Sequence, residues 1–127
     1  MAIKFLINKF KNFFILVIIS CSNFSDIDLD DYKKGIHYYK LQNYDSSVYY
    51  LKNFLRKVPR YKKIADTIIN AHILLAKSLE NKEEYDLAIL VYNDLIKYLQ
   101  KTKKNDPRLE FIRLEISKIY EKKGVKK

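Results

Sequence analysis

Residues 44–51 read YDSSVYYL and residues 85–92 read YDLAILVY, so one Tyr-Asp-x-small-apolar pattern occurs twice at an offset of 41. The same offset relates three small residues, which are Gly35, Ala76 and Ser117. It also relates three bulky residues, which are Tyr38, Leu79 and Tyr120. Similarity at a fixed period is typical of repeat proteins, whose units bury their apolar faces against one another. The chain is therefore predicted to be an all-α solenoid of antiparallel helix hairpins, with five helices in about two and a half repeats.

This pattern resembles the tetratricopeptide repeat (TPR). That motif has a small residue midway along its first helix, a bulky residue three positions later, and Tyr-Asp at the turn into its second helix. The period is longer than the roughly 34 residues of a TPR and falls in the range of HEAT repeats. About seven additional residues equal two helical turns. A TPR with lengthened helices and a HEAT-like repeat both remain open, and the turn pattern favours the TPR.

The composition also favours long helices, because only two glycines and two prolines occur in the 127 residues. We expect helices at 31–42, 44–57, 62–81, 84–101 and 107–123. Pro59 should end the second of them. Asp106 and Pro107 have the residue types of the N-cap and first position of the last helix, and Gly124 is a candidate for the position after its end. The predicted core consists of Val48, Leu51, Leu55, Ile68, Leu75, Ala76, Leu79, Ala88, Val91, Tyr92, Leu95, Ile112, Ile116 and Ile119.

The chain is basic, with a formal net charge of +10, but 21 of its 25 positively charged residues are lysine. A surface that reads phosphates usually carries clustered arginine as well, so we expect no nucleic-acid partner. The single cysteine excludes an intramolecular disulfide and a cysteine-based zinc site.

The N-terminal segment has the organisation of a secretory signal peptide. Residues 1–12 carry three lysines and no acidic residue, and residues 13–19 form an unbroken run of seven apolar residues. Residues 18–21, Ile-Ile-Ser-Cys, resemble a bacterial lipobox, in which a peptidase cuts before the cysteine and the new terminus is acylated with fatty acids such as palmitate. An ordinary signal peptide with a free cysteine is the alternative.

These features predict four segments. Residues 1–20 are a cleaved lipoprotein signal peptide, and residues 21–30 are the acylated Cys21 with a polar, acidic tether. Residues 31–124 are the TPR-like domain, and residues 125–127 are a basic tail. Several acyl chains would hold the protein stably on a membrane, because one chain alone binds reversibly.

Nothing in the sequence predicts an enzyme, a cofactor, a metal site or a small-molecule substrate. His37 and His72 are the only histidines, and no phosphate loop, nucleophile elbow or metal-ligand spacing occurs. We interpret His72 as a packing residue, because it stands at a TPR position usually filled by a bulky side chain.

The whole arrangement resembles the BamD family, the TPR lipoproteins of the outer-membrane β-barrel assembly machinery. The similarity lies in residues 32–35 (YKKG), 43–45 (NYD), 50–55 (YLKNFL) and Pro59, and in the long helix over 64–81, within a stretch that covers 21–124. The resemblance implies an outer-membrane lipoprotein facing the periplasm, with a BamA-type subunit and unfolded barrel proteins as partners. Members of that family usually carry more repeats, so a general TPR adaptor or chaperone-like periplasmic lipoprotein remains the alternative.

In TPR proteins the first helix of each repeat lines a groove that binds partner proteins, and its motif positions can be transferred to this sequence. They are Tyr32, Ile36, Tyr39 and Lys40, then Asn70, Ile73, Lys77 and Glu80, then Phe111, Leu114, Lys118 and Glu121. We expect Phe111 and Leu114 to be exposed, and Lys40, Lys77 and Lys118 to favour an acidic or carboxylate end of the partner. The alternatives are scattered surface apolar residues, or a binding face on the second helices around Tyr49 and Tyr98.

Overall fold

The computed structural model describes residues 27–58 and 64–125, and these contain five helices and no strand. The helices are α2 (Asp30–Lys40), α3 (Tyr44–Lys57), α4 (Ala65–Asn81), α5 (Tyr85–Thr102) and α6 (Arg108–Val125). The predicted all-α fold is confirmed. The predictions for the signal peptide, Cys21, most of the tether, Pro59 and the last two residues of the tail fall outside the described residues.

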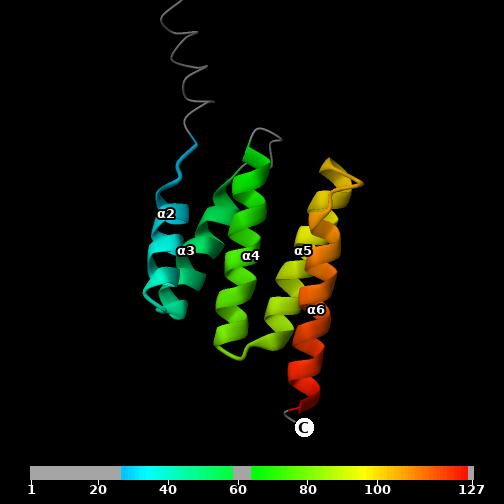
Figure 1. The fold of residues 1–127 in the computed structure, drawn as a ribbon. Coiled ribbons are helices and arrows are strands. Elements are labelled where there is room, and N and C mark those ends of the chain that lie inside the picture. The colour runs from blue at the N-terminus through cyan, green and yellow to red at the C-terminus, as the bar shows by residue number, and fades with distance from the viewer. Residues whose placement is uncertain (1–26, 59–63, 126–127) are drawn as a thin grey trace, which may run out of the picture.

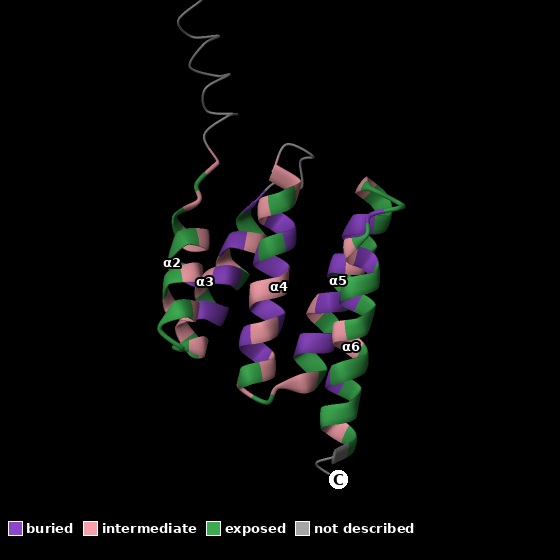
Figure 2. Cartoon of the chain, viewed as in Figure 1, coloured by how far each residue is buried: buried purple, intermediate pink, exposed green. Residues whose placement is uncertain are grey.

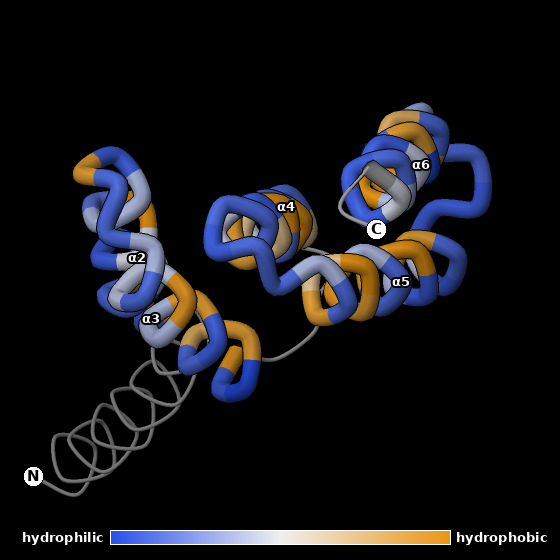
Figure 3. The backbone as a smooth tube through the Cα atoms, turned by 90° about the horizontal axis from the view of Figure 1, so that it is seen from below, coloured by the Kyte–Doolittle hydropathy of each residue, from blue (hydrophilic) through white to orange (hydrophobic). Residues whose placement is uncertain are grey.

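The helices form two layers of antiparallel neighbours. α2, α4 and α6 run in the same direction (Figure 1), and they lie in one layer with α3 and α5 behind them (Figure 3). The closest packing is between α2 and α3, α3 and α4, and α4 and α5, and α6 packs on α5. This arrangement is the predicted series of helix hairpins with a single helix at its end.

The turn inside each hairpin repeats in the same form. Gln42 and Glu83, which are related by the offset of 41, both have a left-handed backbone with φ of 58° and 63°. In the first turn the amides of Gln42 and Asn43 donate to the carbonyls of Tyr39 and Tyr38, and the second turn has the equivalent bonds. These are the two bonds of a Schellman motif, which explains why α2 ends two residues before its predicted end.

Small residues allow the first hairpin to close tightly. Gly35 on α2 lies against Leu51, which is fully buried. The hydroxyl of Ser47 donates to the carbonyl of Gly35 at 2.9 Å, and the Ser78 hydroxyl of α4 lies 3.2 Å from that of Ser47. Three helices therefore meet at one buried polar contact whose groups are all hydrogen-bonded.

One apolar core joins α3, α4, α5 and α6, and the buried residues of these helices are purple in Figure 2. Eleven of the predicted core residues are buried, and Leu55, Val91 and Ile116 are partly buried and packed against them. The core also includes several residues that the sequence analysis did not select: Phe54, Val58, Ile69, Ala71, Ile89, Tyr98, Leu99 and Leu109.

The last helix has the predicted Asp106 cap, begins at Arg108, one residue later than predicted, and does not end as predicted. The Asp106 carboxylate accepts a hydrogen bond from the backbone amide of Arg108 at 2.9 Å, as expected of an N-cap. The prediction that Gly124 follows the helix end was wrong, because α6 continues to Val125 and Gly124 has no left-handed φ. On the inner side of α6, Leu109, Ile112 and Ile119 are buried.

Candidate protein-binding face

The twelve predicted groove residues all lie on α2, α4 and α6, and we call the surface that they form the A-helix face. Contacts between neighbouring helices hold this layer together. The amide of Asn70 donates to the Tyr32 hydroxyl at 2.6 Å, which links α4 to α2. Lys122 forms an ion pair with Glu80 at 3.0 Å, which links α6 to α4. The structure therefore brings the three sets of predicted residues into one layer.

Within each helix of the A-helix face, the apolar members precede the charged ones. Tyr32, Ile73 and Leu114 are related by the offset of 41, so they occupy corresponding positions in the three units. Tyr32 and Ile73 are partly buried, whereas Leu114 is 55% exposed and Phe111 is 41% exposed. The predicted exposure of Phe111 and Leu114 is confirmed.

The charged members lie toward the C-terminal ends of the same helices. Lys118 pairs with Glu115 at 3.1 Å within α6, so its ammonium already has a carboxylate partner. Among the described residues, Lys40 and Lys77 form no ion pair. Lys40 and Lys77 can therefore bind a partner's carboxylate without first breaking an ion pair.

The side chain of Tyr39 lies among polar neighbours at this charged end. Its ring makes an edge-to-face contact with Tyr44, with the ring centres 5.8 Å apart. Burial raises the pKa of the Tyr39 hydroxyl, and the nearby Tyr44 and Glu80 raise it further. Tyr39 thus presents a neutral phenol to any ligand near neutral pH.

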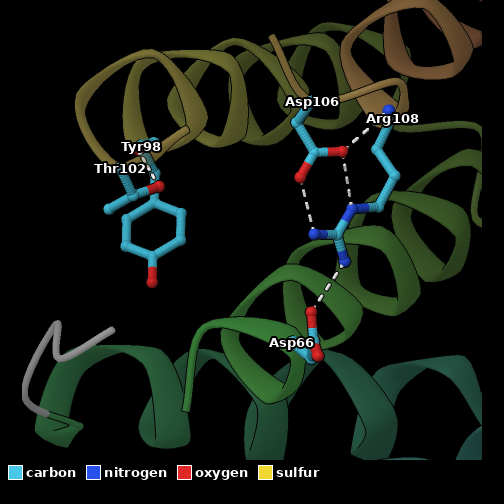
Figure 4. Close-up of polar contacts among 5 residues, drawn as sticks. All are labelled: Asp66, Tyr98, Thr102, Asp106 and Arg108. Carbon is cyan, nitrogen blue, oxygen red and sulfur yellow. Dashed lines mark hydrogen bonds and ion pairs between the residues drawn. The ribbon is translucent and has the colours of Figure 1, made fainter. Parts of the chain in front are cut away.

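An arginine joins α6 to α4 at the opposite, N-terminal end of the layer (Figure 4). The guanidinium of Arg108 donates to both carboxylate oxygens of Asp106, at 2.9 and 2.6 Å, and to the carboxylate of Asp66 on α4 at 2.9 Å. Asp106 is buried, and the hydrogen bonds from Arg108 lower its pKa to about 2. This network joins the start of α6, one helical turn before Phe111, to the start of α4.

The two histidines have structural environments. His72 is buried, its Nδ1 donates to the carbonyl of Ile68 at 2.8 Å, and its ring stacks on Tyr98 with the ring centres 6.4 Å apart. His37 is exposed and makes an edge contact with Tyr38. Within residues 27–58 and 64–125, no group of three or more histidine, cysteine or acidic side chains is placed to hold a metal ion.

The alternative face on the second helices is only partly supported. Tyr49 is 61% exposed on α3, and Leu90 stands at the corresponding position of α5 with 57% exposure. The choice of Tyr98 as an exposed residue of that face was wrong, because Tyr98 is buried in the core against His72. Leu87, one helical turn before Leu90 on α5, is also 44% exposed, so this face carries exposed apolar side chains of its own.

Three polar side chains of this region are largely buried; the sequence analysis selected Tyr92 for the core and Glu80 for the groove, and it missed Glu115. Tyr92 on α5 is fully buried, and the carboxylates of Glu80 and Glu115 are each only 13% exposed. One signal was available in the sequence, because Glu115 stands three residues after Ile112 and four before Ile119. That spacing places a carboxylate on the inner stripe of a helix, where an apolar residue is expected.

No protein-family model, curated protein or solved structure matches the chain, so these comparisons do not assign it to a family. In the part of the chain that the structure describes, none of the helices has the length and apolar character needed to cross a bilayer.

Proposed function

We propose that the protein is a membrane-anchored helical scaffold that binds partner proteins through its A-helix face. The observation that carries the proposal is the pair of exposed apolar side chains, Phe111 and Leu114, on the layer formed by the first helix of each unit. Burial of such side chains is a main source of affinity at protein interfaces, and aromatic residues are frequent among the side chains that dominate binding.

The proposed setting is the outer membrane, facing the periplasm, with Cys21 as the lipid attachment site. The resemblance to BamD-type lipoproteins makes the β-barrel assembly machinery the proposed complex, with a BamA-type subunit and unfolded barrel proteins as the partners. This role depends on binding and needs neither a catalytic residue nor a cofactor.

Co-purification from detergent-solubilised membranes tests the proposed complex. The tagged full-length protein should retain a BamA-type subunit in fixed stoichiometry. Recovery of other periplasmic proteins without such a subunit would replace this assignment with the general adaptor role.

Variants of the A-helix face test the proposed surface in the same experiment. Phe111→Ala and Tyr39→Ala should each weaken partner binding by about 1–3 kcal/mol, because each removes aromatic contact area. Tyr49→Ala, which removes an exposed tyrosine from the opposite layer, is the matched control and should bind normally. Normal partner recovery by both A-helix variants would exclude this face.

The anchor has its own test. Cys21→Ala should block acylation and leave uncleaved precursor or protein that is not membrane-attached. Fatty-acid labelling of the Cys21→Ala variant at the wild-type level would contradict the assigned attachment site.

A further inference from the structure

One end of the helix bundle carries a group of exposed cations. α3 and α5 end there, and α2, α4 and α6 begin there, at the upper end in Figure 1. An ion pair of Lys57 with Asp31 at 3.4 Å joins the end of α3 to the start of α2. The exposed cations of this end, which we call the basic end, are Arg56, Lys97, Lys101, Lys103 and Lys104.

The protein does not neutralise the charges of the basic end. None of its five members forms an ion pair within the described residues. Arg56 donates to the amide oxygen of Asn53 at 2.7 Å, which is a neutral partner. Asp66 and Asp106 lie at this end but are already bound by Arg108. The exposed carboxylates near this end that form no ion pair are fewer than the cations, and they are Asp28, Asp94 and Glu110.

Lysines at the opposite end of the bundle have carboxylate partners. Lys82 pairs with Asp45 at 2.7 Å and with Glu84 at 2.9 Å, and Lys122 pairs with Glu80 at 3.0 Å. Like charges repel one another, so a group of unpaired cations does not serve the stability of the fold. We therefore looked for a ligand of opposite charge near the basic end.

The chain leads from this end of the bundle to the proposed lipid attachment site. Residues 27–29 enter α2 here, and Asp30, the first residue of α2, follows Cys21 by nine positions. Nine residues span at most about 30 Å when fully extended. An acyl chain on Cys21 would keep the start of α2 within this distance of a bilayer, which gives the neighbouring basic end a high effective concentration at the lipid surface.

We propose that the basic end docks on a bilayer surface that contains anionic phospholipid. This inference rests on the membrane anchoring in the proposed function, and it specifies how the domain meets the membrane. Each lysine or arginine close to such a surface strengthens binding by about fivefold. The helices stand on the bilayer by these ends, and the A-helix face, which runs along the sides of α2, α4 and α6, stays accessible to a partner.

The composition of the basic end favours phospholipid over nucleic acid. Four of its five members are lysine, whereas a surface that reads nucleic-acid phosphates usually carries clustered arginine. A lysine ammonium is a compact point charge on a flexible side chain. It can therefore follow headgroup phosphates that diffuse in the plane of the bilayer.

The test uses the full protein, purified from membranes in detergent and inserted into preformed vesicles. The vesicles contain phosphatidylcholine alone, or phosphatidylcholine with about one third phosphatidylglycerol. Acetylation by an N-hydroxysuccinimide ester is measured at each lysine by mass spectrometry, and this reagent attacks only the neutral amine. An anionic surface at about −50 mV raises the local proton concentration about sevenfold, so lysines beside it react more slowly.

The four lysines of the basic end should react about threefold more slowly in the anionic vesicles than in the neutral ones. The difference should vanish in about 1 M salt, where the Debye length is about 3 Å. Lys122 is the internal control, because it lies near the far end of α6, a helix about 27 Å long. It is therefore beyond the reach of about 10 Å that the surface charge has at 0.1 M salt, and its rate should be equal in both vesicles.

A double variant tests whether the group acts together. Replacing Lys97→Gln and Lys101→Gln should return Lys103 and Lys104 to the rate that they have in neutral vesicles. The matched control replaces two lysines at the far end of α6, Lys122→Gln and Lys123→Gln, and should leave the slow reaction of the basic end unchanged.

Equal rates at the basic end in both vesicles, slow reaction that persists in high salt, or equal slowing of Lys122 would each overturn the proposal. Slowing by duplex DNA but not by anionic vesicles would overturn it in favour of nucleic acid. Flotation separates this result from the proposed function. Protein that does not float with phosphatidylcholine vesicles lacks the anchor, whereas protein that floats but shows no slowing in anionic vesicles has the anchor without the docking surface.

Discussion

Replacement of Gly35 by alanine should destabilise the protein, although alanine is the better helix former. A Cβ atom at Gly35 would lie 2.5 Å from Cδ2 and 2.6 Å from Cγ of Leu51. Leu51 is fully buried, so its side chain cannot turn into solvent, and α2 must move away from α3. That movement also lengthens the 2.9 Å hydrogen bond from Ser47 to the Gly35 carbonyl.

The expected magnitude follows from three terms. Overpacking of a core costs about 1–3 kcal/mol, and weakening a buried hydrogen bond costs up to about 1 kcal/mol. The gain in helix propensity from glycine to alanine offsets about 1 kcal/mol. The three terms sum to a net loss of unfolding free energy of about 0–3 kcal/mol. The central value of about 1.5 kcal/mol lowers the Tm of a domain of this size by about 6–12 °C.

Gly124 supplies the matched control, because it is also a helical glycine. A Cβ atom there meets nothing within 4 Å, so Gly124→Ala should gain about 0.5 kcal/mol from helix propensity alone. Both variants are compared with the wild-type full chain by circular dichroism during thermal unfolding in the same detergent. A Gly35→Ala variant that is as stable as Gly124→Ala would refute the close packing of α2 on α3.

Three further changes have expected outcomes. Because the pKa of Asp106 is lowered to about 2 in the fold, its contribution of about 2 kcal/mol should be complete above about pH 5 and fall as the pH drops toward about 1. Asp106→Asn should remove this part of the pH dependence in denaturant titrations, and an unchanged profile would contradict it. Gln42→Gly should raise the unfolding free energy by up to about 1 kcal/mol, because glycine accepts the left-handed φ of 58° without strain; a lower midpoint in urea would argue against that turn. Removal of residues 107–127 exposes the apolar side of α5 and should cost several kcal/mol, so unchanged thermal unfolding would exclude the capping role of α6.

The hairpins could be predicted from the sequence because their signals are local and repeated. The small residues, the Tyr-Asp turns and the Asp106-Pro107 pair each act within a few positions of the chain, and the offset of 41 repeats the small residues and the Tyr-Asp turns. Gly124 misled the prediction, because a glycine marks a helix end only where it adopts a left-handed φ, and Gly124 does not.

The candidate site was only partly predictable, because its polar contacts join residues far apart in the chain. Arg108 binds Asp66, and Glu80 binds Lys122, across 42 positions in each case. Whether such side chains meet depends on how each helix is rotated about its axis. Periodicity predicts which face of a helix is apolar, but it does not predict which polar side chains of neighbouring helices contact one another.

Site-specific photo-crosslinking in intact cells tests the central claim, that the A-helix face binds the partner. A photoreactive phenylalanine analogue replaces Leu114, which is 55% exposed on α6, or Leu90, which is 57% exposed on α5. We predict that illumination joins the position 114 variant to the co-purifying BamA-type subunit and yields no such adduct at position 90. The adduct at position 90 and its absence at position 114 would contradict the assignment of the binding face.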